Sequence, residues 1–196
     1  MNVRSLVSKV SAAVVLAAAV CTSTASAASA TWTIDAVHST VLFRIHHLGA
    51  GYTYGRFNEL SGSIVVDDAN LAASSVKVEV KTASVDTNSK DRDAHLSGPD
   101  FFNAGQFPTI TFASTSIKKN GDAAYDVTGD LTLHGIKKSV TVKMDKTGEG
   151  KDMKGKEIIG FEGTVTILRS EYDIKKYLPN IGDEVRLTLA FEAIKQ

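Results

Sequence analysis

The sequence has almost no cysteine. Its 196 residues include only one, Cys21, which lies close to the N-terminus. A disulfide framework, a thiolate metal site and a cysteine nucleophile are therefore excluded from the rest of the chain. Long apolar runs are missing as well. The longest, from Val10 to Val20, is shorter than the roughly 20 residues that a membrane-spanning helix needs.

The N-terminal segment is typical of a secretory signal peptide. Arg4 and Lys9 precede or open the apolar run, and small residues follow it from Thr22 to Ala30. This order of positive, apolar and small-residue regions predicts export, with cleavage after Ala27 and a mature domain of residues 28–196. The alternatives are cleavage at a second small-residue site three positions later, and retention of the segment as a membrane anchor.

An excess of charge of one sign is also lacking. Basic and acidic residues number 22 each, and loss of the signal peptide removes Arg4 and Lys9, which leaves 20 basic residues. A net charge of about −2 argues against a nucleic-acid partner and against a polybasic membrane-binding surface. The mature length fits one domain that can build a core without covalent links.

Catalytic motifs are missing too. The chain contains no G-x-S-x-G elbow, no H-E-x-x-H pair and no P-loop. Gly49-Ala50-Gly51 lacks the third glycine of a dinucleotide-binding loop. We therefore expect no enzymatic activity and no cofactor.

What the sequence does have is a two-residue alternation of apolar and polar side chains. Val76, Val78 and Val80 alternate with charged residues, and the stretches 125–133, 140–145 and 184–192 follow the same pattern. This period predicts strands with one dry and one wet face, as in antiparallel sheets. We expect an all-β domain of about eight strands, and a barrel rather than a sandwich because closure removes exposed edges.

Turn and helix signals interrupt the alternation. Asn120-Gly121 and His134-Gly135 predict tight turns between strands. The segment from Asn88 to Asp91 is typical of a helix start, and the helix is expected to run through Leu96 and to stop near Gly98-Pro99. We expect this short helix to cover one end of the barrel.

The predicted helix carries a candidate site for a ligand head group. Arg92 and His95 lie three positions apart, on one helical face, where they could receive an anionic group. The alternative is a local ion pair with Asp91 or Asp93, or packing against Phe101 and Phe102.

A glycine-rich segment before Tyr52 and Tyr54 is the second candidate for the mouth of the barrel. It predicts either a flexible aromatic loop that gates the mouth or an ordinary hairpin connection.

Histidines raise a metal-site hypothesis. They are His38, His46, His47, His95 and His134. His46 and His47 are neighbours on a predicted strand, so their side chains point to opposite faces and cannot easily share one ion. A site of two histidines and one carboxylate is the alternative to a role in capping turns or satisfying backbone groups. We expect no bound metal.

Several short stretches between Trp32 and Ala193 form a recognisable set. They are Trp32-Thr33-Ile34-Asp35 with His38-Ser39, Phe43-Arg44-Ile45, His47-Leu48-Gly49, Gly55-Arg56-Phe57, Ser84-Val85-Asp86-Thr87, Arg92-Asp93-Ala94-His95-Leu96, Asp100-Phe101-Phe102, Phe107-Pro108-Thr109-Ile110-Thr111-Phe112, Gly129 to Gly135, Gly160-Phe161 and Gly182-Asp183-Glu184-Val185. Together they resemble the YceI-like family of bacterial polyisoprenoid-binding proteins. The resemblance implies a lipocalin-like barrel in the periplasm with a long apolar interior. It also implies a ligand with a polyprenyl tail, such as a quinone or a prenyl phosphate, and no catalytic residues.

The dry faces of the strands would line this interior. We expect an apolar tunnel formed by Phe43, Ile45, Phe57, Val78, Val80, Phe112, Val127, Leu131, Val142, Phe161, Val165 and Leu189. Many dry-face positions are small, Gly129 and Gly163 among them, and small residues in an eight-stranded barrel would leave volume for one ligand. The rival interpretation is a packed core.

These observations predict an exported carrier of a long polyisoprenoid lipid, present as a monomer or homodimer. A membrane redox or lipid-handling protein is the expected macromolecular partner. Two alternatives stay open: a metal-dependent enzyme or stress-response protein that uses the histidines, and a pocketless partner module of a membrane redox protein.

Overall fold

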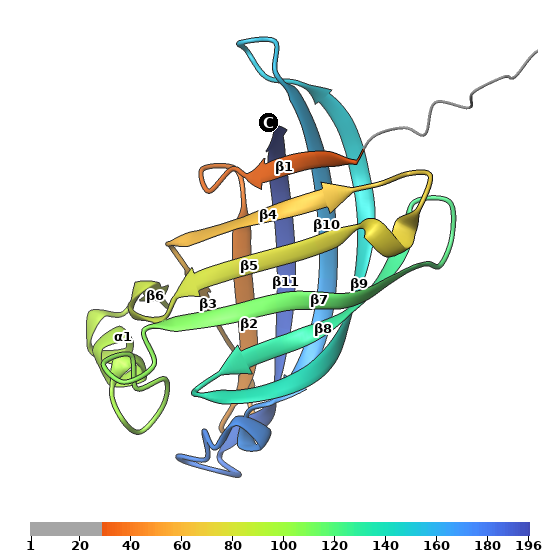
Figure 1. Cartoon of the computed structure of the whole chain (residues 1–196). Coiled ribbons are helices and arrows are strands. Elements are labelled where there is room, and N and C mark those ends of the chain that lie inside the picture. Colours follow the sequence, from red (N-terminus) through yellow and green to blue (C-terminus); the bar gives the residue numbers. More distant parts are fainter. Residues whose placement is uncertain (1–28) are drawn as a thin grey trace, which may run out of the picture.

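The computed structural model describes residues 29–196, so the expected signal peptide and its cleavage after Ala27 lie outside the described residues. The described chain is a strongly curved antiparallel sheet with a short helix at one end (Figure 1). Its strands are β1 (Ala30–Ile34), β2 (Thr40–His47), β3 (Gly51–Phe57), β4 (Leu60–Val66), β5 (Ser75–Lys81), β6 (Val85–Asp86), β7 (Thr109–Lys119), β8 (Ala124–Leu133), β9 (Ile136–Lys151), β10 (Glu157–Leu168) and β11 (Ile181–Lys195). Its helices are α1 (Lys90–Ser97) and the 3₁₀ turns η1 (Leu71–Ala73), η2 (Thr82–Ser84) and η3 (Arg169–Tyr172).

Eight of these strands close into a ring. The order is β1-β4-β5-β7-β8-β9-β10-β11, and β11 pairs back to β1, with Trp32 opposite Lys195 and Ile34 opposite Ala193. Every pairing in the ring is antiparallel. This confirms the expected all-β antiparallel barrel of about eight strands.

The last strand, β11, pairs with two strands along the same edge. Its C-terminal part pairs with β1, and its N-terminal part, from Ile181 to Ala190, pairs with β2. Strands β3 and β6 then extend the sheet beyond β2. The barrel is therefore closed by β1 near the C-terminus and widened by the β2–β3 hairpin towards the end where α1 lies (Figure 1).

The predicted turns and the helix are present. His134 and Gly135 connect β8 to β9 and both have positive φ, 52° and 73°, as a two-residue hairpin of the favoured twist requires. The Asn120-Gly121 turn connects β7 to β8 but spans four residues. Helix α1 begins after Ser89 and ends before Gly98, as its sequence predicts.

The glycine-rich segment at residues 49–55 differs from one of its two interpretations. Gly51 to Phe57 is strand β3, paired in continuous register with β2, and the connection is a short turn through Leu48, Gly49 and Ala50. The flexible gating loop is therefore wrong, and the ordinary hairpin is correct. Tyr52 and Tyr54 alternate with smaller residues, as the residues of a strand do, and this alternation agrees with the hairpin.

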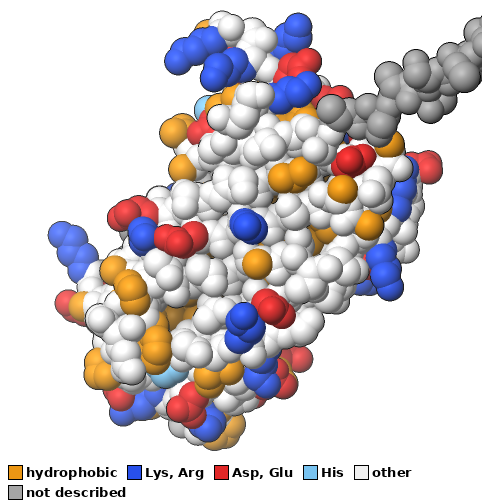
Figure 2. Space-filling model, in the orientation of Figure 1, with side chains coloured by type: hydrophobic (Ala, Val, Ile, Leu, Met, Phe, Trp, Pro, Cys, Tyr) orange, Lys and Arg blue, Asp and Glu red, His pale blue; other side chains and the backbone are white. Residues whose placement is uncertain are grey.

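The visible outer surface carries basic and acidic side chains interspersed, with apolar groups gathered towards the end that bears α1 (Figure 2). Within residues 29–196, no helix combines the length and the apolar character needed to cross a membrane.

Candidate functional site

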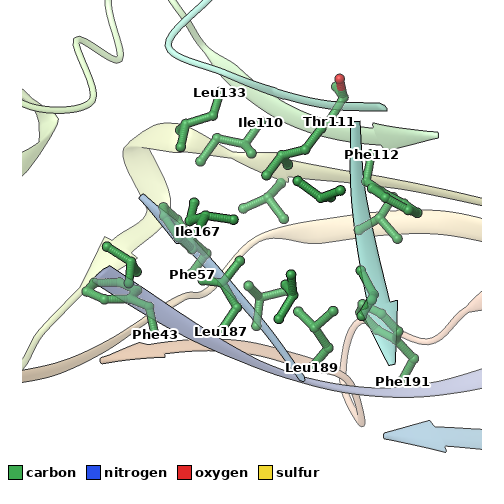
Figure 3. Close-up of a pocket in the computed structure, with 18 of the residues that line it drawn as sticks. Phe43, Phe57, Ile110, Thr111, Phe112, Leu133, Ile167, Leu187, Leu189 and Phe191 are labelled. Atoms are coloured by element: carbon green, nitrogen blue, oxygen red, sulfur yellow. The ribbon is translucent and has the colours of Figure 1, made fainter. Parts of the chain in front are cut away.

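The barrel encloses a cavity of about 380 Å³. That volume lies within the range of roughly 300–1,000 Å³ typical of small-molecule sites. Its walls are the inner faces of the strands, and Figure 3 shows Ile110, Phe112 and Leu133 on one wall facing Leu187 and Leu189 on the other. Most of the side chains that line it are aliphatic or aromatic.

All twelve residues predicted to form a tunnel line this cavity. They are Phe43, Ile45, Phe57, Val78, Val80, Phe112, Val127, Leu131, Val142, Phe161, Val165 and Leu189. The physical reason is the strand period, which places alternate side chains on the same face. Their role in binding a ligand stays a prediction. Met144, Ile159, Leu187 and Phe191 also line the cavity, and the same alternation marks their inward position.

The inner-face glycines do not leave the free space that their size predicts. A Cβ on Gly129 would lie 2.5 Å from the Phe112 ring, and one on Gly163 would collide with the Met144 sulfur and with the Lys143 carbonyl oxygen. Side chains of neighbouring strands therefore cover these backbones. The free volume comes from the width of the barrel, not from the glycines.

Helix α1 closes one end of the cavity, and its two predicted head-group residues both reach the lining. Arg92 donates from Nε to Thr87 Oγ1 and from Nη2 to the Thr87 carbonyl oxygen, both at 2.7 Å. Asp93 accepts from the Thr87 backbone N–H at 2.8 Å. The local ion pair of Arg92 with Asp91 or Asp93, which was the alternative interpretation, does not form. Instead both side chains bind Thr87 and hold α1 against the end of β6.

His95 takes part in a cluster that joins two distant segments. Its ring packs against Phe101 and Tyr177, with centroid separations of 5.0 and 6.1 Å. Asp100 contacts both His95 Nε2 and Lys176 Nζ at 3.1 Å. These two hydrogen bonds hold the pKa of Asp100 below its ordinary value, and the one from His95 has the larger effect. We call these five residues the end cluster; it connects the α1–β7 segment to the η3–β11 segment.

Arg169 is a further cation of this end, and sequence reasoning missed it. It begins η3, is only 4% exposed and also lines the cavity. Its guanidinium donates to the backbone carbonyl oxygens of Gly182, Ile174 and Ile181 at 2.8–2.9 Å. Burial lowers the pKa of Arg169, and the nearby Asp183 carboxylate acts in the opposite direction. No local sequence motif predicts the burial of Arg169, because its hydrogen-bond acceptors lie in the segment after η3, which folds back onto it.

Tyr52 and Tyr54, predicted at the mouth, lie elsewhere. Both are more than half exposed, and neither lines the cavity. The inward residues of β3 are Thr53 and Phe57. Tyr52 instead packs under Arg44, whose guanidinium carbon lies 4.2 Å from the ring centroid on the outer face of the β2–β3 hairpin.

The histidines are dispersed over the barrel. His47 lines the cavity, whereas His46 stacks on Tyr52. In residues 29–196, the grouping that could hold a metal is Asp35, His38 and Glu192, with His38 Nδ1 2.7 Å from Asp35 Oδ2. That hydrogen bond raises the pKa of His38 and lowers the pKa of Asp35. A site of two histidines and a carboxylate is absent from the described part of the chain.

Comparison with known proteins finds the same domain in other proteins. The model of the YceI-like domain matches residues 32–193. The chain belongs to the YceI-like family. A UPF0312 protein of Pseudomonas paraeruginosa is 47% identical to it over 159 residues, which cover 81% of this chain and 83% of that protein.

Two solved structures share this barrel fold. The crystal structure of BcnA from Burkholderia cenocepacia superposes with a TM-score of 0.74 at 28% identity, covering 81% of this chain and 98% of that one. A polyisoprenoid binding domain from Saccharophagus degradans superposes with a TM-score of 0.67 at 16% identity, covering 84% and 98%. Members of the YceI-like family are binding proteins, and the matched span includes the whole cavity.

Proposed function

We propose that this YceI-like protein binds a long polyisoprenoid lipid, a quinone or a prenyl phosphate, with the tail inside the barrel. The observation that carries the proposal is the cavity itself, which is enclosed by strands and lined almost throughout by apolar side chains. A branched hydrocarbon chain matches such a lining in polarity, and burial of apolar surface is the main driving force available to it. The structural relative from Saccharophagus degradans, described as a polyisoprenoid binding domain, supports the same ligand class.

The free energy expected for binding of the tail is compatible with a lipid carrier. A tail that loses ~600 Å² of apolar surface gains ~15 kcal/mol at ~25 cal/mol per Å². Association and ordering of the tail oppose this by about 4–15 kcal/mol. The net affinity then depends on tail length, so that a carrier can hold a long tail and exclude short ones.

We propose that the protein does this work in the periplasm after export. The support is the N-terminal pattern of Arg4, Lys9 and the apolar run that follows. The intact mass of the native exported protein tests it, with a mature N-terminus at Ala28 expected. A full-length or acylated species would contradict export by this route.

The experiment that tests lipid binding is mass spectrometry of the organic extract of the native protein, purified without detergent. We expect a co-purified isoprenoid in near-stoichiometric amount, and a mock purification from cells lacking the protein is the control. A parent protein that carries no lipid and takes up none from added prenyl ligands would contradict the carrier. The partner-module interpretation would then replace it.

A further inference from the structure

The two ends of the cavity differ in the polar side chains that line them. The end near α1 and η3 is lined by Arg92, Arg169, His47 and His95. Among the described residues that line the cavity, the one carboxylate is Asp68, which lies with Ser74 and Leu71 around η1. In Figure 1, η1 and α1 lie at opposite ends of the barrel. Lys146 also lines the cavity but pairs with Glu149, so what distinguishes the α1 end is its two guanidinium groups, which suit an electron-rich head.

Arg169 is the less solvated of the two arginines at this end. Its side chain is 4% exposed, and it takes part in none of the ion pairs formed among residues 29–196. Buried charges in proteins are normally paired, because desolvation of an isolated charge is expensive. The nearest acid, Asp183, is engaged elsewhere, since its two carboxylate oxygens accept from the Ser170 backbone N–H and from Ser170 Oγ.

The hydrogen bonds of Arg169 do not use the whole guanidinium. Nε, Nη1 and Nη2 each donate once, to three neutral carbonyl oxygens. A guanidinium carries further N–H groups on its two terminal nitrogens, and its planar fork suits a phosphate or carboxylate. The three carbonyls hold the group rigidly beside the cavity, which reduces the entropy lost when a ligand binds.

We propose that Arg169 is the head-group residue of this cavity, and that it selects ligands with an anionic head over neutral ones of the same tail. The inference rests on the proposed function, and it goes further by assigning the head class and the direction of the ligand. The anionic oxygen lies at Arg169, and the tail extends towards the Asp68 end. Arg92, which is exposed to water and already bonded to Thr87, contributes less.

The test uses two probes with one tail, geranylgeranyl phosphate and geranylgeraniol, titrated into delipidated protein at pH 7.5. We expect the parent to bind the phosphate at least about tenfold more tightly, as for a charge-assisted hydrogen bond. Arg169→Gln should bring the affinity ratio close to one. Arg92→Gln is the matched control, and it should change the ratio by less than about threefold because water screens an exposed cation.

Asp183→Asn keeps the test decisive if Arg169→Gln does not fold. An asparagine can preserve both hydrogen bonds to Ser170 while removing the negative charge beside Arg169. The phosphate preference should rise several-fold, a direction that a purely structural Arg169 would not produce. Equal affinity of the parent for both probes would overturn the inference. It would also be overturned if Arg92→Gln lost the phosphate preference and Asp183→Asn showed no rise in it. Failure of both probes to bind the parent would instead overturn the proposed function.

Discussion

The wall of the barrel and its α1 end are built in different ways. The wall is continuous backbone pairing, filled by side chains of adjacent strands such as Phe112 over Gly129. The α1 end is held by side-chain contacts between distant segments, for example Asp100 with Lys176 and Arg169 with Gly182. Under the proposed function, this difference separates two tasks: the wall would exclude water and hold an apolar tail, and the α1 end would recognise the head group and control access.

The largest effect is expected from a charge in the wall. Val127 is 5% exposed and lines the cavity, so Val127→Asp places a carboxylate where a tail would have to desolvate it. Binding of a long prenyl lipid should fall below detection in a tryptophan-fluorescence or calorimetric titration. The same substitution at Val37, which is 84% exposed, is the control and should bind as the parent does. Undiminished binding by folded Val127→Asp would place the ligand outside the barrel.

The wall should also be intolerant of added volume at a covered glycine. A Cβ at Gly163 would lie 2.5 Å from the Lys143 carbonyl oxygen, so backbone as well as Met144 must move. Gly163→Leu should lower the free energy of unfolding by about 3 kcal/mol, the upper part of the range for overpacking. Gly163→Leu therefore tests how closely the wall is packed.

Gly148 is the matched control for that substitution. It lies on the neighbouring part of the sheet, and nothing lies within 4 Å of a Cβ built there. Gly148→Leu should change the free energy of unfolding by less than about 1 kcal/mol. Urea denaturation followed by circular dichroism measures both variants, and equal losses would show that the close approach at Gly163 is not limiting.

The α1 end should show the reverse behaviour, with little effect on stability and a clear effect on kinetics. Asp100→Asn removes the charge that joins His95 to Lys176. Exposed ion pairs contribute about 0–1 kcal/mol, so the melting temperature should barely change. Lipid release to acceptor vesicles should become several-fold faster because the two segments separate more readily. Release at the parent rate would mean that ligands leave by another route.

The smallest expected effect is a change in the rate of lipid release at acidic pH. Hydrogen bonds from His95 and Lys176 depress the pKa of Asp100, so its contribution is present above its unfolded pKa of about 3.9 and is lost as pH falls through the lower folded value. Lipid release by the parent should therefore accelerate only below about pH 4. Asp100→Asn should be fast at every pH and should not show this step. A step of equal size in the variant would assign it to another carboxylate.

Local sequence anticipated the parts of the molecule whose geometry is local. The alternation around Val76–Val80 and Val140–Met144 was enough to orient those strands, because side chains two positions apart share a face. Asn88 to Gly98 likewise contained its own start and stop signals, and α1 occupies that span. For residues 49–55 the sequence left a flexible loop and a hairpin as alternatives, because glycine and tyrosine fit a loop and a strand about equally well without knowledge of the partner strand.

By itself, then, the sequence determined that residues 29–196 form antiparallel strands with one apolar face and one short α-helix, since period and capping act between near neighbours. Only the tertiary structure decided what those faces enclose. Closure of β1 on β11 turns a dry face into a cavity, and the fold-back of the chain after η3 buries Arg169 at its end. The physical reason is that a buried charge and a cavity both depend on contacts between residues far apart along the chain, which no local pattern encodes.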